Sequence, residues 1–143
     1  MKRILVATDG SDCAGRALDA AADLAKTYGA ELIVATVEQG YLQGELEEFR
    51  WVENASVEEI LNAVSAEILK RASDRTAALG AKVARTHAGL GDAASFILEV
   101  AAREHPDVIV VGKRGRGRLS GLLLGSVSQK LVTLAQCNVL VVP

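Results

Sequence analysis

The sequence is poor in aromatic residues, cysteine and proline, and it has no long apolar run. Aromatic residues make up 3% of its 143 residues, whereas half of the chain is apolar. A core of this composition must be aliphatic, so we expect Ala-rich helices packed on strands rich in Val and Ile. The length fits one domain and leaves no room for a second, which predicts a single domain over residues 1–143.

These absences also exclude several classes of protein. The purest apolar runs, Val108–Val111 and Val139–Val142, are far too short to cross a bilayer. Cys13 and Cys137 lie far apart and match no metal-ligand spacing. Two thiols in a chain without a recognisable signal peptide favour a reducing compartment, so we expect a cytoplasmic protein with no membrane partner.

Acidic residues are absent from Val108 to the end of the chain, where five cations gather. The first 107 residues therefore carry a net charge of −7, since the whole chain carries −2. The cations are Lys113, Arg114, Arg116, Arg118 and Lys130. A local cationic patch on an acidic protein suits a small anion better than a long polyanion, which argues against a nucleic-acid partner.

Strand and helix patterns alternate strictly along the chain. Apolar runs predict five strands, at Ile4–Ala7, Glu31–Val37, Ala81–Ala88, Val108–Val111 and Val139–Val142. Helical spacing predicts four helices, at Asp12–Tyr28, from the Ser56 cap to Gly80, from the Asp92 cap to His105, and at Ser126–Ala135. Gly40–Asn54 follows no period and is interpreted as a surface excursion. The alternation predicts a Rossmann-like α/β fold, an open five-stranded parallel sheet with helices on both faces.

Two strand ends are more polar than the others. Thr8-Asp9-Gly10 follows the first predicted strand, and Gly112–Gly117 follows the fourth. Ligands of open parallel sheets bind outside the carboxyl ends of the strands, where the winding direction reverses. We therefore expect both loops to face one crevice.

The segment Gly112–Ser126 has the composition of a phosphate-binding loop. Glycines let backbone N–H groups approach an anion without interference from Cβ. Gly125 and Ser126 open the next helix, whose first amides and positive dipole end attract phosphate, and Ser126 adds a hydroxyl donor. Composition alone leaves a solvated basic turn as an equal alternative. A Walker A loop fails because it needs Lys followed by Ser or Thr after its last glycine, whereas Ser126-Val127 follows Gly125. A dinucleotide fingerprint fails because it belongs after the first strand, which is followed here by Asp9-Gly10-Ser11.

A longer pattern, Gly112, two residues, Gly115, nine residues and Gly125-Ser126, resembles the nucleotide-binding signature of the universal stress protein family. The opening Ile4–Ser11 and the closing Cys137–Pro143 are similar to the family's first and last strands, so the resemblance covers the whole chain. It implies a stress-response regulatory domain that binds ATP, or another adenine nucleotide such as AMP, with Mg²⁺ or Mn²⁺ on the phosphates. It also implies a homodimer formed through Val139–Val142.

The resemblance assigns roles to ten residues along the nucleotide. By this resemblance, Ala7, Thr8 and Asp9 lie at the base and ribose end of the nucleotide, and Val37 covers the adenine. The ribose and phosphates border Gly112, Arg114 and Gly115, and the phosphate tail lies on Gly125, Ser126 and Val127. A carboxylate repels phosphate, so Asp9 is expected at the end of the ligand away from Gly125 and Ser126. The alternative for Asp9 is a turn residue that caps the first helix.

Two other functions remain open at the level of sequence. A slow ATPase or phosphotransferase would need a metal and a group that orients the nucleophile. No convincing base or metal carboxylate accompanies the loop, so no catalytic residue is assigned. A nucleotide-free interaction module could instead use the apolar edge Val139–Val142. His87 and His105 have no nucleophile or paired carboxylate in a recognisable arrangement, and we predict structural or surface roles for both.

Overall fold

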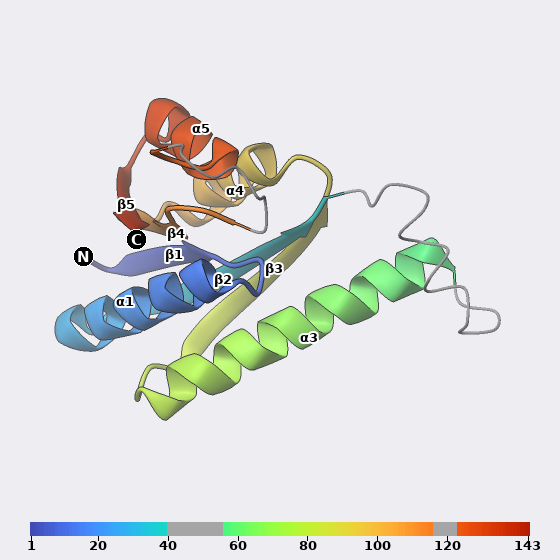
Figure 1. The fold of residues 1–143 in the computed structure, drawn as a ribbon. Coiled ribbons are helices and arrows are strands. Elements are labelled where there is room, and N and C mark those ends of the chain that lie inside the picture. The colour runs from blue at the N-terminus through green and yellow to red at the C-terminus, as the bar shows by residue number, and fades with distance from the viewer. Residues whose placement is uncertain (40–55, 116–122) are drawn as a thin grey trace.

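The computed structural model describes residues 1–39, 56–115 and 123–143, and their strands form one five-stranded parallel sheet (Figure 1). The strand order is β3-β2-β1-β4-β5. The elements are β1 (Arg3–Ala7), α1 (Asp12–Tyr28), β2 (Glu31–Glu38), α3 (Val57–Ala78), β3 (Val83–Leu90), α4 (Ala93–Glu104), β4 (Val108–Gly112), α5 (Ser126–Leu134) and β5 (Asn138–Val142). The predicted α/β fold is confirmed, although β3 begins and ends two residues later than its weak alternation predicted. The predicted excursion Gly40–Asn54 lies outside the described residues.

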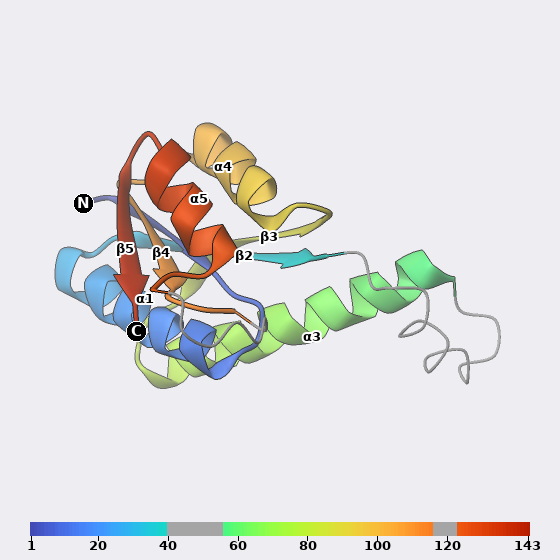
Figure 2. The same cartoon turned by 45° about the horizontal axis from the view of Figure 1, so that its top comes forward.

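Helices cover both faces of the sheet, α1 and α3 on one and α4 and α5 on the other (Figures 1 and 2). Successive strand residues point to opposite faces, so each central strand supplies both cores. On β1, Val6 packs with the α1 side and Leu5 with the α4 and α5 side, and both are fully buried. The chain winds from β1 to β3 in one direction and then returns to β4, on the other side of β1. The winding therefore reverses between β1 and β4.

Side-chain caps fix the predicted helix starts. Ser11 caps α1 by accepting the Ala14 N–H, and Ser56 with Glu59 forms the predicted capping box of α3. Gly29 ends α1 in the left-handed conformation at φ +62°, which glycine adopts without strain. The caps confirm that local sequence signals set these boundaries.

Asp92 caps α4 and also connects that helix to α5. Its Oδ2 accepts from the Ser95 hydroxyl at 2.7 Å and from the Ser95 N–H at 2.9 Å, and its Oδ1 accepts from Lys130 Nζ at 3.3 Å. The Ser95 hydroxyl and amide, with smaller help from Lys130, lower the pKa of Asp92 from 3.8 to about 2. Because the pKa is depressed in the folded state, the ionised carboxylate stabilises the protein above about pH 4, and this contribution is lost as the pH falls toward 2.

Replacing Asp92 with asparagine is expected to lower the free energy of unfolding at neutral pH, because asparagine retains the cap but not the charge. The difference between the two proteins should shrink as the pH falls from about 4 toward about 2, where the wild-type carboxylate becomes protonated. Urea unfolding of both proteins at a series of pH values measures this difference in the free energy of unfolding. A difference that stays constant across this range would contradict the assigned role of the charge.

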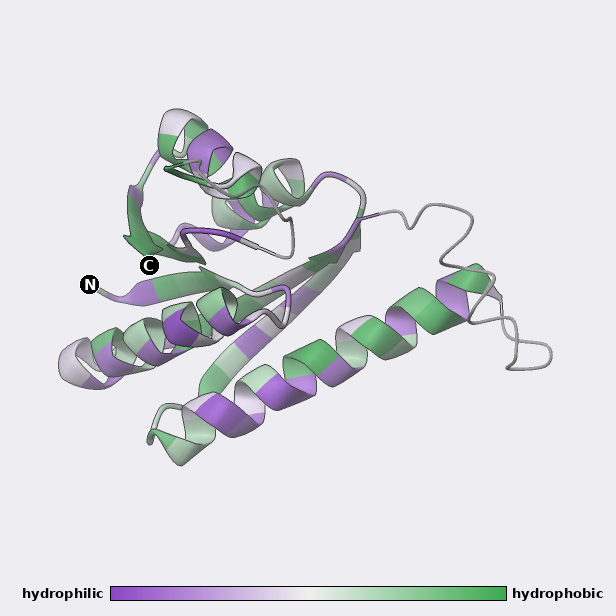
Figure 3. Ribbon diagram, in the orientation of Figure 1, coloured by the Kyte–Doolittle hydropathy of each residue, from purple (hydrophilic) through white to green (hydrophobic). Residues whose placement is uncertain are grey.

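Part of α3 lies beyond the sheet. Its amino-terminal turns extend past the carboxyl ends of the strands (Figures 1 and 2), and Figure 3 shows apolar bands along them. Leu61 and Ile68 are buried, but Val57 is 49% exposed. Tyr28, the last residue of α1, is 56% exposed because the helix ends there at Gly29.

The two histidines have the structural roles that were predicted. His87 Nε2 lies 2.8 Å from Glu104 Oε1, which links β3 to the end of α4. His105 is the C-cap of α4, in the left-handed conformation at φ 50°. Among the described helices, none is long and apolar enough to cross a membrane.

Candidate functional site

The loop after β1 is folded by its own side chains. Thr8 Oγ1 accepts the Gly10 N–H at 3.2 Å, and Asp9 Oδ1 accepts the Ser11 N–H at 2.9 Å. Gly10 has φ +79°, a conformation that favours glycine. Asp9 is thus a turn residue, as the alternative interpretation held, but the cap of α1 is Ser11.

Asp9 also contacts the glycine-rich loop that follows β4. A Cβ added to Gly115 would lie 2.7 Å from Asp9 Oδ2, closer than real Cβ atoms come to an oxygen. Only glycine allows this approach without displacing the carboxylate. The loops after β1 and β4 therefore meet at the carboxyl edge of the sheet.

The start of the glycine loop rests on α1 and on the end of β5. A Cβ at Gly112 would lie 3.0 Å from the backbone carbon and the Sγ of Cys13, so the first turn of α1 packs directly on this glycine. The Arg114 N–H donates to Cys13 Sγ at 3.5 Å, and the Cys13 thiol donates to the Val142 carbonyl at 3.5 Å. Lys113 N–H donates to the same carbonyl at 2.6 Å. Cys13 is half-buried and contacts both the glycine loop and the end of β5.

The end of the loop returns to its beginning. The Gly125 N–H donates to the Lys113 carbonyl at 2.8 Å, and a Cβ on Gly125 would lie 3.3 Å from that oxygen. Gly125 is the N-cap of α5 and has no side chain to cap it, and the first turn of α5 carries no acidic residue. The Ser126 and Val127 amides therefore belong to a helix N-terminus suited to an anion.

Several predicted site residues converge here, and others lie apart. Asp9, Gly112, Arg114, Gly115 and Gly125 are joined by the contacts just described. Ala7 and Val37 pack on the α4 and α5 side of the sheet. Thr8 instead lines a groove between α1 and α3. The middle of the loop, with the predicted cations Arg116 and Arg118, lies outside the described residues.

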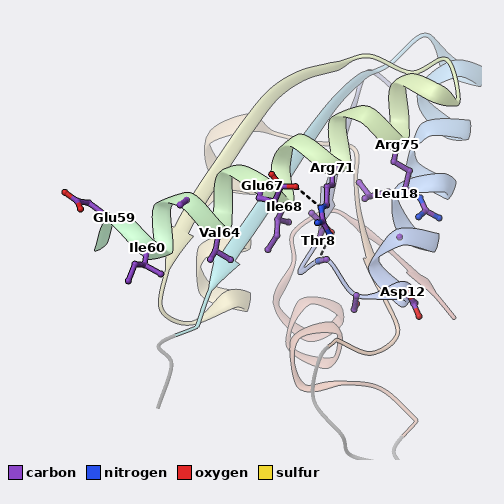
Figure 4. A pocket seen from close by; sticks show the side chains of 15 residues that line it. Thr8, Asp12, Leu18, Glu59, Ile60, Val64, Glu67, Ile68, Arg71 and Arg75 are labelled. Atoms are coloured by element: carbon purple, nitrogen blue, oxygen red, sulfur yellow. Dashed lines mark hydrogen bonds and ion pairs between the residues drawn. The ribbon is translucent and has the colours of Figure 1, made fainter. Parts of the chain in front are cut away.

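The groove between α1 and α3 has a volume of about 800 Å³ and was not predicted (Figure 4). One wall is the apolar stripe of α3, with Ile60, Val64 and Ile68. Both arginines that line it are paired with carboxylates, Arg71 with Glu67 at 2.9 Å and Arg75 with Asp19 at 2.6 Å. The apolar α3 stripe in the sequence was the available signal. With its cations already paired, the groove suits phosphate less well than the glycine loop and the α5 N-terminus do.

A parallel sheet that winds in both directions from its central strand, with a glycine-rich segment leading into a helix at the reversal, is the architecture of α/β nucleotide-binding folds. The family model of the universal stress protein family matches residues 1–143. The chain belongs to the universal stress protein family.

Individual relatives agree with this assignment. The chain is 39% identical to universal stress protein YxiE of Bacillus subtilis over 145 residues, covering 98% of this chain and 97% of the relative. It is similar to the crystal structure of a universal stress protein in complex with cAMP, with 28% identity, a TM-score of 0.74 and coverage of 99% and 97%. It is also similar to UspA from Lactobacillus plantarum, with 26% identity, a TM-score of 0.79 and the same coverage.

Proposed function

We propose that this chain binds an adenine nucleotide, preferentially ATP, at the carboxyl ends of β1 and β4 and acts as a regulatory domain in the stress response. The observation that carries the proposal is the meeting of the two ends of the glycine segment, where Gly115 approaches Asp9 and the Gly125 N–H donates to the Lys113 carbonyl at the start of α5. The solved relative in complex with cAMP supports an adenine nucleotide as the class of ligand.

The charges of the site set the direction of the nucleotide. Asp9 accepts hydrogen bonds from a ribose hydroxyl or the adenine amino group, and its charge repels phosphate. The phosphate tail then lies against Gly125 and on the amides of Ser126 and Val127, where the helix dipole is positive. Gly112, Arg114 and Gly115 border the ribose and the phosphates between these ends. Ala7, Thr8 and Val37 stay assigned to the base end, with the side chain of Val37 against adenine.

The nucleotide in this proposal selects a conformation or an assembly state and is not consumed. Mg²⁺ or Mn²⁺ would arrive on the phosphate oxygens. In residues 1–39, 56–115 and 123–143, no group of three His, Cys, Asp or Glu side chains is placed to hold a metal ion. In this proposal the protein's own groups bind and orient the nucleotide.

Equilibrium dialysis of the full chain against ATP, AMP and cyclic AMP, with and without Mg²⁺, tests the proposal. We expect binding of ATP at or below millimolar concentration. An absence of binding by all three nucleotides at millimolar concentration would exclude it. A turnover assay on the same protein, followed through successive purification steps, separates bound nucleotide from hydrolysed nucleotide.

We further propose that a homodimer forms through β5. Among the described strands, β5 lies at one edge of the sheet and pairs only with β4, so its outer edge offers main-chain groups to a second strand. Apolar side chains lie exposed beside that edge, with Leu140 of β5 at 38% and Val132 and Leu134 of α5 at 51% and 59%. A second copy would cover both features.

Replacing Leu140 with lysine is expected to convert the dimer into a monomer, because a charge at a strand edge opposes pairing. Light scattering after size exclusion should then report the 15.0 kDa of one chain in place of twice that mass. Leu90→Lys is the matched control, since Leu90 is 54% exposed at the end of β3 on the opposite edge. A monomeric wild-type chain at micromolar concentration would rule out the dimer.

A further inference from the structure

Ser128 is a buried hydroxyl residue at the base of the glycine loop, in the first turn of α5. It is 2% exposed and belongs to none of the site residues assigned above. Its Oγ lies 3.0 Å from the Lys113 carbonyl oxygen and 3.0 Å from the Gly125 carbonyl oxygen. A hydroxyl has one proton to donate, so it donates to either carbonyl in turn.

Those two carbonyls belong to opposite ends of the loop. Lys113 directly follows β4, and Gly125 directly precedes α5. The bond to Gly125, three residues back, is the ordinary local bond of a serine within a helix. The bond to Lys113 spans 15 residues, and local helix geometry does not require it. Ser128 therefore fastens the beginning of the loop to the helix at its end.

The Lys113 peptide also connects Ser128 to the edge strand β5. Its carbonyl accepts from the Gly125 N–H as well as from Ser128, and its N–H donates to the Val142 carbonyl at 2.6 Å. Ser128 thus belongs to a junction in which β4, the start of α5 and the last residue of β5 are held together. The first amides of α5 owe their position relative to Gly115 to this junction.

We propose that Ser128 is a positioning residue of the nucleotide site, which holds the two ends of the glycine loop together, Lys113 after β4 and Gly125 before α5. The proposal rests on the proposed function of that loop. Because Ser128 is buried, it acts through Lys113 and Gly125 and not by touching the ligand. A loop closed in advance loses less conformational freedom when the nucleotide binds, so the hydroxyl raises affinity without adding a ligand contact.

The test compares Ser128→Ala, Ser128→Thr and the control Ser65→Ala, which removes another buried hydroxyl from α3, far from the loop. Calorimetry with ATP should show a dissociation constant about five- to tenfold higher for Ser128→Ala, the effect of one lost hydrogen bond. Threonine keeps a hydroxyl that bonds such carbonyls and should restore most of the affinity. Ser65→Ala should bind ATP as the wild type does.

Amide hydrogen exchange in the absence of nucleotide separates a local change at the loop from a change in the stability of the whole protein. The Gly125 amide should exchange faster in Ser128→Ala than in Ser65→Ala, relative to core amides of β1. If the wild type binds ATP and Ser128→Ala binds it equally well, the positioning role is overturned and the nucleotide site stands. If the wild type binds no nucleotide, the proposed function fails, and an unchanged Gly125 exchange rate would overturn loop closure by Ser128 as well.

Discussion

Replacing Gly125 with valine is expected to weaken ATP binding about 10- to 100-fold while the protein remains folded. The valine Cβ would lie 3.3 Å from the Lys113 carbonyl oxygen and 3.4 Å from the Arg114 Cα, so its methyl groups force the loop away from α5. Overpacking of this kind costs about 1–3 kcal/mol, which corresponds to that range of affinity. The backbone of Gly125, at φ −70° and ψ 164°, is one that valine adopts without strain.

Calorimetry on two further variants shows whether the loss of affinity is specific to the glycine loop. Gly125→Ala adds only the Cβ and should show a smaller loss of affinity. Val64→Gln changes the groove between α1 and α3 and should leave ATP affinity unchanged. If Val64→Gln lost binding while Gly125→Val retained it, the nucleotide would belong in the groove and the assignment to the glycine loop would be wrong.

Replacing Leu131 with alanine is expected to lower the free energy of unfolding by about 3 kcal/mol. Leu131 is 0% exposed and packs α5 against the core on its side of the sheet. The substitution removes the buried methyl groups and leaves a cavity that the neighbouring strands cannot fill completely. Urea unfolding followed by circular dichroism measures the change.

The matched control for Leu131 is Leu134 on the same helix, which is 59% exposed. Leu134→Ala should change the free energy of unfolding by less than about 0.5 kcal/mol, as is usual at a surface position. Equal losses in the two variants would mean that α5 does not pack as described, and would remove the support of the helix N-terminus in the proposed site.

Most of the fold could be predicted because local signals and burial agree. Val108–Val111 and the other central strands are short runs of apolar residues, as expected for strands covered on both faces. The caps at Ser56 and Asp92 and the left-handed Gly29 mark helix ends that depend on neighbouring residues alone. The meeting of the loops after β1 and β4 was predictable for a different reason, since parallel strands bring their carboxyl ends to one edge of the sheet.

The remaining features depend on contacts between distant segments. The contacts of Cys13 and Ser128 with the glycine loop span 101 and 15 residues, and no local pattern distinguishes these side chains from ordinary small core residues. The groove lies beside the part of α3 that extends past the strands. The apolar spacing of α3 in the sequence predicts instead a helix that is packed along its whole length. Val57 and Tyr28 are exposed at the ends of their helices, and sequence periodicity does not predict this, because it gives the apolar face of a helix but not how far the sheet reaches beneath it.

An NMR titration of the ¹⁵N-labelled chain with ATP tests the nucleotide site most directly. If ATP binds as proposed, the largest shifts of backbone amides will fall on Asp9, on Gly112–Gly115 and on Gly125–Val127, with small shifts along α3. Largest shifts at Ile60–Ile68, or no shifts at millimolar ATP, would contradict nucleotide binding at the glycine loop.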